Sequence, residues 1–235
     1  MCTVSFVSTN NGFVITSNRD EQISRVAEFP KEYQINGIKI FYPKDPAAGG
    51  TWYAVNQNGN VVVLLNGADE KHVHNPPYAR SRGLVVLEIA SSKNTITKWE
   101  ITDLEGVEPF TIVLFDSKNL FQMRWNGTNK SAIDLALNKV HFWSSATLYN
   151  SDIRIKRQEW FNEFLSKSAS VSARDLLYFH ENTHAENREN GLIINRNDTL
   201  KTLSITQAII SKKEIILKHK DLVVDKTSEI LISIQ

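Results

Sequence analysis

The sequence contains one cysteine, Cys2, among its 235 residues. A single thiol cannot form an internal disulfide, so the chain is not a disulfide-stabilised scaffold and fits a reducing compartment. Long hydrophobic runs are also missing. The longest uninterrupted aliphatic segment, 61–65, is far shorter than the roughly 20 residues that a membrane helix needs, so we expect no membrane span.

An excess of charge of either sign is absent as well. The chain has 27 lysines and arginines against 26 aspartates and glutamates, a formal net charge of +1. This balance provides no general attraction to nucleic acid or to an anionic membrane. The first residues also lack the basic segment and the long apolar core of a signal peptide. We therefore expect a cytoplasmic protein that does not bind nucleic acid.

The remaining composition is that of an ordinary globular protein. Hydrophobic residues make up 41% of the chain and charged residues 23%, which is enough apolar surface for a sizeable core. Because 235 residues lie at the upper end of what one core can organise, we expect a single domain over residues 1–235. The sequence has neither a phosphate-binding loop nor a dinucleotide-binding fingerprint, and we expect no cofactor.

Hairpin patterns dominate the first half of the chain. Runs of β-branched and aromatic residues flank turns that contain asparagine and glycine, residues that adopt left-handed conformations easily. The pattern predicts six short strands before residue 66 and further strands after residue 110. The predicted strand segments are 3–8, 13–16, 34–42 with a turn at 36–37, 51–56, 61–65, 111–115, 120–125 and 141–146.

Helical spacing of apolar residues occurs in three segments. It predicts helices over 83–90 and 153–165, and a third helix that a capping box at Ser172 opens and that runs to residue 179. The chain then returns to strand patterns at 203–210, 214–217 and 229–234. This order of elements favours an α+β fold with layered, largely antiparallel sheets.

Cys2 is the first candidate for chemistry. Removal of Met1 would leave a cysteine that carries both a thiol and a free α-amino group. An α-amino group has a pKa near 8, so it can accept the thiol proton close to neutral pH without a histidine. The alternative is that Cys2 is merely a small apolar residue at the start of a strand.

Arg19 and Asp20 are the predicted partners of Cys2. A hairpin that turns near residues 10–11 brings residue 2 opposite residues 18–20. Asp20 could then hold the α-amino group, while Arg19 would favour a thiolate and an anionic substrate. The alternative is a solvated ion cluster at the end of a strand.

Several short motifs together resemble the NRDE family, which is the family of transport and Golgi organisation protein 2. The resemblance covers about the first 90 residues well and the remainder by the order of its elements. The motifs are Met1-Cys2-Thr3-Val4, Asn18-Arg19-Asp20-Glu21, Gly49-Gly50-Thr51-Trp52, Asn66-Gly67 and Arg80-Ser81-Arg82-Gly83.

This resemblance implies a four-layer αββα sandwich similar to the N-terminal nucleophile hydrolases. The cysteine branch of that superfamily, which includes bile salt hydrolases and penicillin V acylases, cleaves non-peptide amide bonds. Carried over to the matching positions, Cys2 is the nucleophile, and Arg19 and Asp20 place the thiol and the amino group. Asn66 resembles the asparagine that donates to the oxyanion, and its alternative role is that of a turn residue.

Two features depart from the pattern of those acylases. The acylases separate the arginine and the aspartate by two residues, whereas Arg19 and Asp20 are adjacent and therefore face opposite sides of a strand. Lys201 stands where the acylases offer an arginine in the last third of the chain. The candidates for substrate binding are Asn18, Trp52, Arg80, Arg82 and Lys201, and for Trp52 core packing is the alternative.

Two histidine patterns compete with this interpretation. His180-Glu181-Asn182-Thr183-His184 matches the H-E-x-x-H motif of zinc proteases. The polar run 185–190 that follows instead favours a solvated helix end, and we expect no metal site there. His72 and His74 lie in a polar loop over 66–80, which we interpret as exposed. The alternative is that this loop, with Arg80 and Arg82 nearby, binds the carboxylate or phosphate of a ligand.

The sequence thus predicts a cysteine amidohydrolase that acts on a small non-peptide amide through an acyl-enzyme formed on Cys2. The alternative is a non-catalytic carrier that binds an amphipathic small molecule, such as haem or an acyl conjugate, in the same cleft. If the protein is a hydrolase, a Cys2→Ala variant should lose turnover. If it is a carrier, the same variant should keep its ligand binding nearly intact.

Overall fold

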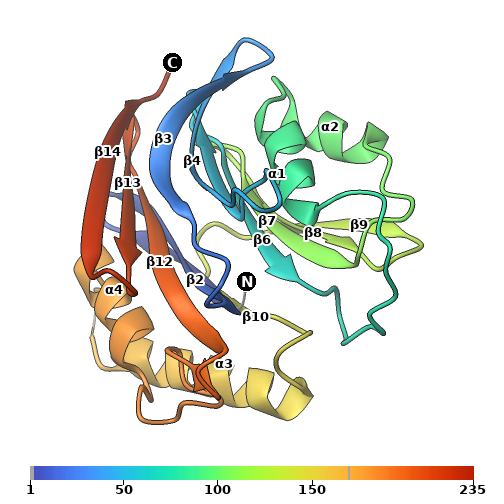
Figure 1. Cartoon of the computed structure of the whole chain (residues 1–235). Helices are drawn as coiled ribbons and strands as arrows, with labels where there is room; N and C mark the ends of the chain where they lie inside the picture. Colours follow the sequence, from blue (N-terminus) through green and yellow to red (C-terminus); the bar gives the residue numbers. More distant parts are fainter. Residues whose placement is uncertain (1–2, 169) are drawn as a thin grey trace.

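Two antiparallel sheets are stacked face to face, and a pair of helices covers the outer face of each sheet (Figure 1). The structure is a computed structural model that describes residues 3–168 and 170–235. Helices α1 (Arg82–Ala90) and α2 (Thr95–Ile101) lie on one side, and helices α3 (Ser151–Ser166) and α4 (Ala173–Asn182) lie on the other. This is the predicted four-layer αββα arrangement.

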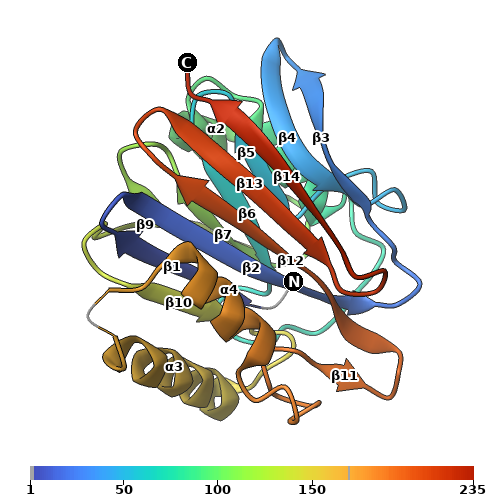
Figure 2. The same cartoon turned by 90° about the vertical axis from the view of Figure 1, so that its left-hand side faces the viewer.

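The first sheet has the strand order β10-β1-β2-β12-β13-β14, with β11 paired to β12 (Figure 2). Helices α3 and α4 pack on this sheet, against β10 and against β2 and β12 respectively. Its strands are β1 (Thr3–Thr9), β2 (Gly12–Gln22), β10 (His141–Ser144), β11 (Asn195–Arg196), β12 (Leu200–Ile210), β13 (Glu214–Asp221) and β14 (Lys226–Ser233).

The second sheet runs in chain order from β3 to β9, and α1 packs on β5 and β6. Each strand is paired antiparallel with the next one in the sequence, and the long connection between β6 and β7 carries α1 and α2. Its strands are β3 (Glu28–Ile35), β4 (Ile38–Lys44), β5 (Tyr53–Asn56), β6 (Val61–Asn66), β7 (Phe110–Phe115), β8 (Leu120–Trp125) and β9 (Lys130–Leu135).

The predicted turns form where asparagine and glycine allow a left-handed backbone. Asn36 and Gly37 have φ values of 53° and 78°, the combination that a tight two-residue hairpin requires. In the first hairpin, Thr9 pairs with Gly12 and Thr3 pairs with Asn18. The predicted capping box of α4 is also present, because Ser172 and Asp175 each bond the other's backbone N–H.

A buried tyrosine joins the two sheets. The Tyr53 side chain is fully buried; its hydroxyl donates to the carbonyl of Ile15 on β2 at 2.9 Å and accepts the N–H of Ala208 on β12 at 3.0 Å. Burial raises the pKa of Tyr53, so the hydroxyl stays protonated and keeps its donor. This link fixes the position of β5 over the first sheet, next to the connection that carries Trp52.

The sequence patterns missed one helix, α2, and two strands, β9 and the two-residue β11. Helix α2 is only seven residues long and contains β-branched residues, so its spacing has little helical character. Strand β9 lies at the edge of its sheet and is mostly exposed, which removes the alternation of apolar and polar residues. None of the helices in the described part of the chain is long and apolar enough to cross a membrane.

Candidate active site

The tetrad 18–21 lies at the end of β2, and its side chains alternate between the two faces of the first sheet. Arg19 points toward the second sheet, where it meets Asp45 and Trp52. Asp20 points toward the helices, where it accepts the hydroxyls of Thr202 at 2.5 Å and Tyr149 at 3.2 Å. Arg19 and Asp20 are each only 2% exposed, so they do not form a solvated ion cluster.

Arg19 is held on three sides. Its Nη1 donates to the carbonyl of Arg25 at 2.8 Å, and its Nη2 donates to Oδ2 of Asp45 at 3.3 Å. The guanidinium carbon lies 4.4 Å from the centre of the Trp52 ring, within the range of a cation–π contact. Burial lowers the pKa of Arg19, while Glu21 and Asp45 raise it. An arginine remains charged under this balance, so a fixed positive charge lies between the sheets.

Asp45 holds the guanidinium of Arg19 in place, although no sequence pattern singled this aspartate out. Its Oδ1 accepts the backbone N–H groups of Ala47 and Ala48, at 3.0 and 3.2 Å, in the turn after β4. Its Oδ2 accepts both Arg19 and Arg25. An aspartate followed by proline and small residues is a typical turn signal, but its link to β2 depends on the stacking of the two sheets.

A pocket with a volume of about 70 Å³ opens over Arg19. Its walls come from the end of β2, the connection between β4 and β5, the end of β6 and the beginning of α1. Four of the predicted site residues line it, namely Arg19, Trp52, Asn66 and Arg82. Glu21, Arg25 and Asp45 add further charge to the lining. The pocket is therefore strongly polar, with Trp52 as its aromatic wall.

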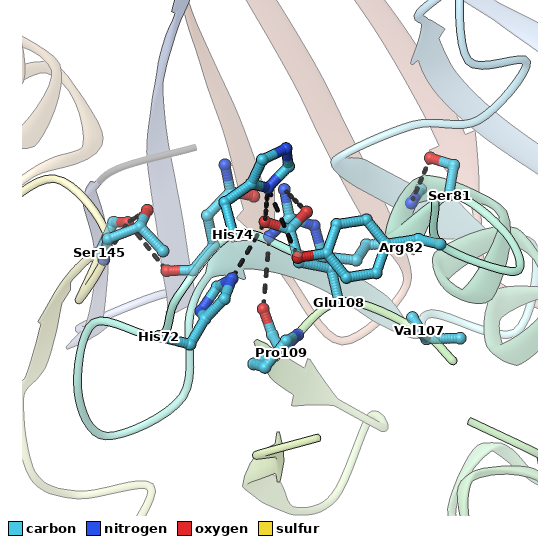
Figure 3. Close-up of polar contacts among 12 residues, drawn as sticks. His72, His74, Ser81, Arg82, Val107, Glu108, Pro109 and Ser145 are labelled. Atoms are coloured by element: carbon cyan, nitrogen blue, oxygen red, sulfur yellow. Dashed lines mark hydrogen bonds and ion pairs between the residues drawn. The ribbon is translucent and has the colours of Figure 1, made fainter. Parts of the chain in front are cut away.

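Arg82 reaches the pocket from the first position of α1. Its Nη2 pairs with Oε2 of Glu108 at 2.9 Å, and its Nη1 donates to the carbonyl of Pro109 at 3.3 Å (Figure 3). The other oxygen of Glu108 accepts His72 Nε2 at 3.0 Å and His74 Nδ1 at 3.3 Å. Burial lowers the pKa of Arg82, and Glu108 opposes that shift.

These contacts tie the polar loop 66–80 to the pocket. The His72 side chain is 16% exposed, whereas that of His74 is 66% exposed, so the loop is only partly the exposed segment that the sequence predicts. Glu108 was not among the predicted residues. It is recognisable only in three dimensions, because it lies 36 residues from His72 and 26 residues from Arg82 in the chain.

Asn66 ends β6 beside the pocket. Its carbonyl accepts the hydroxyl of Ser145 at 2.8 Å (Figure 3). The next residue, Gly67, has a φ of 82°, and the hydroxyl of Thr111 donates to its carbonyl at 2.9 Å. The half-buried side chain of Asn66 lines the pocket, so the residue both terminates the strand and presents an amide to the cavity.

Asn18 lies on the opposite face of the sheet from the pocket. Its Nδ2 donates to the carbonyls of His180 and Leu192, at 3.1 and 2.7 Å. Its Oδ1 therefore accepts Nδ1–H of His180 at 2.5 Å, and Nε2 of His180 accepts the hydroxyl of Ser5 at 2.8 Å. These bonds dock α4 on β2, and Asn18 does not reach the pocket.

The H-E-x-x-H segment does not form one helical face. Helix α4 ends at Asn182, and His184 lies beyond it with a φ of 50°. His180 is fully buried, and burial together with the nearby Arg157 lowers its pKa to about 3. The interpretation of the whole segment as a solvated helix end is thus wrong for His180. Residues 3–168 and 170–235 contain no cluster of three or more histidine, cysteine or carboxylate side chains suited to a metal ion.

Two other predicted residues are engaged outside the pocket. Arg80 pairs with Glu88 at 2.6 Å and donates to the carbonyl of Asp103 at 2.6 Å. Lys201 pairs with Asp198 at 2.8 Å. Neither residue lines the pocket over Arg19.

Cys2 lies outside the described residues, which begin at Thr3. Thr3 pairs with Asn18, the neighbour of Arg19, and its hydroxyl accepts a bond from the fully buried Arg157. Arg157 also donates to the carbonyls of Asn190 and Gly191, at 2.7 and 2.6 Å. The start of β1 is therefore anchored at the same end of the sheet as Arg19 and Asp20.

Comparisons with known proteins agree with this fold. A family model described as Transport and Golgi organisation 2 matches residues 1–228. Among solved structures, the N-acylethanolamine-hydrolyzing acid amidase orthologue from Caenorhabditis elegans is similar, with a TM-score of 0.62 at 12% identity over 88% of this chain and 92% of that one. A search of curated sequences finds no match.

Conjugated bile acid hydrolase from Clostridium perfringens is similar in two further structures. Its cysteine-to-alanine mutant gives a TM-score of 0.57 at 8% identity over 98% of this chain and 92% of that one. An arginine-to-leucine variant gives a TM-score of 0.54 at 9% identity over 97% of this chain and 92% of that one. At these identities the likeness shows a shared fold of the N-terminal nucleophile hydrolase type.

Proposed function

From the premise that the chain belongs to the Transport and Golgi organisation 2 family, we propose that it is an amidohydrolase whose nucleophile is the thiol of Cys2. Cys2 acts once Met1 is removed. The observation that carries the proposal is the buried guanidinium of Arg19 in a pocket. Thr3, to which Cys2 is bonded, pairs with Asn18, the neighbour of Arg19.

The reaction proceeds in two steps. The thiol attacks the carbonyl carbon of the amide while the α-amino group accepts its proton, which gives a tetrahedral oxyanion. The carbon–nitrogen bond then breaks, and the leaving amine takes the proton back from the α-ammonium group. Water, activated by the same amino group, hydrolyses the thioester, releases the acid and restores the thiol.

Three described residues support these steps. A fixed guanidinium such as that of Arg19 lowers the pKa of a nearby thiol and so raises the thiolate fraction. The side-chain amide of Asn66 can donate to the oxyanion from the pocket wall. Asp20, which holds the hydroxyls of Thr202 and Tyr149, supplies a carboxylate for the α-ammonium group.

The first test is the state of the N-terminus and the reactivity of the only thiol. We expect the intact mass to show loss of Met1, and a thiol-reactive acyl probe to label the folded protein far faster than the urea-unfolded one. Substitution Arg19→Gln should slow labelling about tenfold, because the thiol pKa rises when the charge is removed. Retention of Met1 together with an unreactive thiol would overturn the proposal.

The second test is turnover. A panel of N-acyl amides should be cleaved by the native chain and not by Cys2→Ala, while Asn66→Ala should lower kcat about a hundredfold through loss of one oxyanion donor. Arg80→Gln is the matched control, because Arg80 pairs with Glu88 away from the pocket. Unchanged turnover in Cys2→Ala would exclude Cys2 as the nucleophile.

The alternative of a haem or acyl carrier in the same cleft has less support from the lining of this pocket. Carrier sites for such ligands are mostly apolar, whereas Arg19, Glu21, Arg25, Asp45 and Arg82 all line the cavity. Tight binding of haem by Cys2→Ala, without turnover of any amide by the native chain, would favour the carrier.

A further inference from the structure

We propose that the pocket over Arg19 receives an anionic group of the substrate, so that the amide it cleaves carries a carboxylate, sulfonate or phosphate near the scissile bond. This inference rests on the proposed hydrolase function and specifies its substrate class. Four features of the pocket lead to it: its arginines, an indole N–H without a partner among the described residues, a helix N-terminus and its size.

Three guanidinium groups from separate parts of the chain line the pocket. Arg19 comes from β2, Arg25 from the connection between β2 and β3, and Arg82 from the first position of α1. Two carboxylates, Glu21 and Asp45, also line it, and Glu108 pairs with Arg82 from outside the pocket, so the three arginines share three carboxylates. Each guanidinium carries five N–H donors, which leaves donors for an additional anion.

Trp52 provides an independent indication of an acceptor-rich occupant. The residue is 3% exposed and lines the pocket, yet its Nε1–H has no hydrogen-bond partner among the described residues. Buried N–H groups are nearly always paired in folded proteins. A carboxylate or phosphate in the pocket that Trp52 lines would bring an acceptor close to this donor, whereas an apolar occupant would not.

The beginning of α1 contributes a third feature. Ser81, Arg82 and Gly83, at the N-terminus of this nine-residue helix, line the same pocket. The positive end of the helix dipole favours anions at that position. The helix end alone would not define a site, but here it adds to the arginines and to the indole N–H of Trp52.

The size of the cavity limits the group that it accepts. A volume of about 70 Å³ corresponds to room for on the order of five water molecules, which suits a carboxylate, a sulfonate or a phosphate. A fused ring system or a long acyl chain does not fit inside. We therefore place the charged head group in the pocket and the scissile carbonyl at its edge beside Asn66, with the remainder of the amide outside.

Glu108 acts on this site from outside the pocket. It pairs with Arg82 through Oε2 and with His72 and His74 through Oε1 (Figure 3). It offsets part of the charge of Arg82 and fixes the orientation of its guanidinium. Arg25 is the more adaptable arginine, because its side chain is 37% exposed and its partners, Glu21 and Asp45, both line the pocket.

The experiment compares amides that each carry one ten-carbon chain and differ in charge. N-decanoylglycine carries an anion on the amine side close to the scissile bond, the N-decyl monoamide of succinic acid carries one on the acyl side close to that bond, and N-decanoylethanolamine is neutral. We expect kcat/KM to be at least about tenfold higher for one of the two anionic amides, the effect of about one charge-assisted hydrogen bond. Equal kcat/KM for all three would overturn the anionic subsite and leave the hydrolase standing.

Variants then assign the preference to the pocket. Arg25→Gln and Arg82→Gln should each reduce the ratio of anionic to neutral kcat/KM to near one, mainly through KM. Arg80→Gln, two residues from Arg82 but outside the pocket, should leave the ratio unchanged. The side chain of Arg25 is 37% exposed and that of Arg82 is 17% exposed, so an unchanged ratio in Arg25→Gln would overturn the assignment even if Arg82→Gln fails to fold.

Binding to Cys2→Ala separates this inference from the proposed function. Calorimetric titration of Cys2→Ala with the same three amides measures affinity without turnover. If the native chain cleaves none of them but Cys2→Ala binds an anionic amide at least about tenfold more tightly than the neutral one, the subsite stands and the hydrolase fails. Absence of both cleavage and charge-selective binding would overturn both.

Discussion

Two buried histidines should make the protein sensitive to mild acid. His180 is fully buried between α4 and β2, and burial, reinforced by Arg157, lowers its pKa to about 3. His219 on β13 is 2% exposed and bonds the hydroxyl of Thr206. Burial lowers its pKa to about 4, and Asp221 only partly opposes that shift.

The sign of the effect follows from where each state binds a proton. In the unfolded chain a histidine takes up a proton near pH 6.5, whereas in the folded protein both side chains remain neutral down to about pH 4. Acid therefore stabilises the unfolded state. Between pH 7 and pH 5 each histidine should lower the free energy of unfolding by about 2 kcal/mol, and the pair by about 4 kcal/mol.

Urea unfolding at pH 7, 6 and 5, followed by circular dichroism, measures this slope. The substitution His180→Gln should remove about half of the pH dependence, because glutamine does not titrate, whatever it costs in stability at pH 7. His74→Gln is the control, since the side chain of His74 is 66% exposed and its removal should leave the slope nearly intact. The same slope in His180→Gln as in the native chain would refute the assignment of a buried, neutral His180.

Two further substitutions test the packing around the site. Asn18→Ala removes the donor to the carbonyls of His180 and Leu192 and should lower the free energy of unfolding by about 2–3 kcal/mol. Ser17→Ala deletes a buried hydroxyl that has no hydrogen-bond partner among the described residues and should be nearly neutral. Equal losses of the two variants in urea titrations would contradict this account. Gly83→Ala should lower the Tm by several degrees, because its Cβ would lie 2.9 Å from the backbone N and O of Thr51; an unchanged Tm would show that α1 can shift at no cost.

Local sequence signals predicted most of the fold. Asparagine and glycine at 36–37 set the hairpin turn because both residues tolerate a positive φ. Ser172 and Asp175 marked the start of α4 because a capping box satisfies N–H groups within one turn. Elements whose local pattern is weak, such as the short helix α2 and the exposed edge strand β9, were missed for the same reason.

The alternation of residues in β2 also followed from the sequence. Successive side chains on a strand point to opposite faces, so the adjacency of Arg19 and Asp20 already implied two different environments. The structure places Arg19 with Asp45 and Trp52, and Asp20 with Thr202 and Tyr149. The sequence predicts that the side chains of Arg19 and Asp20 point to opposite faces of the strand, but it does not predict which residues each side chain contacts.

Only the tertiary structure decided which charged residues share the pocket. Arg80 and Arg82 are two positions apart and look equivalent in the sequence, yet one pairs with Glu88 outside and the other lines the cavity beside Glu108. Arg25 and Asp45 join the site because the stacking of the two sheets brings segments distant in sequence together. The direction of a side chain along a strand or a turn depends on neighbouring residues, whereas the partners that it reaches depend on how whole layers pack.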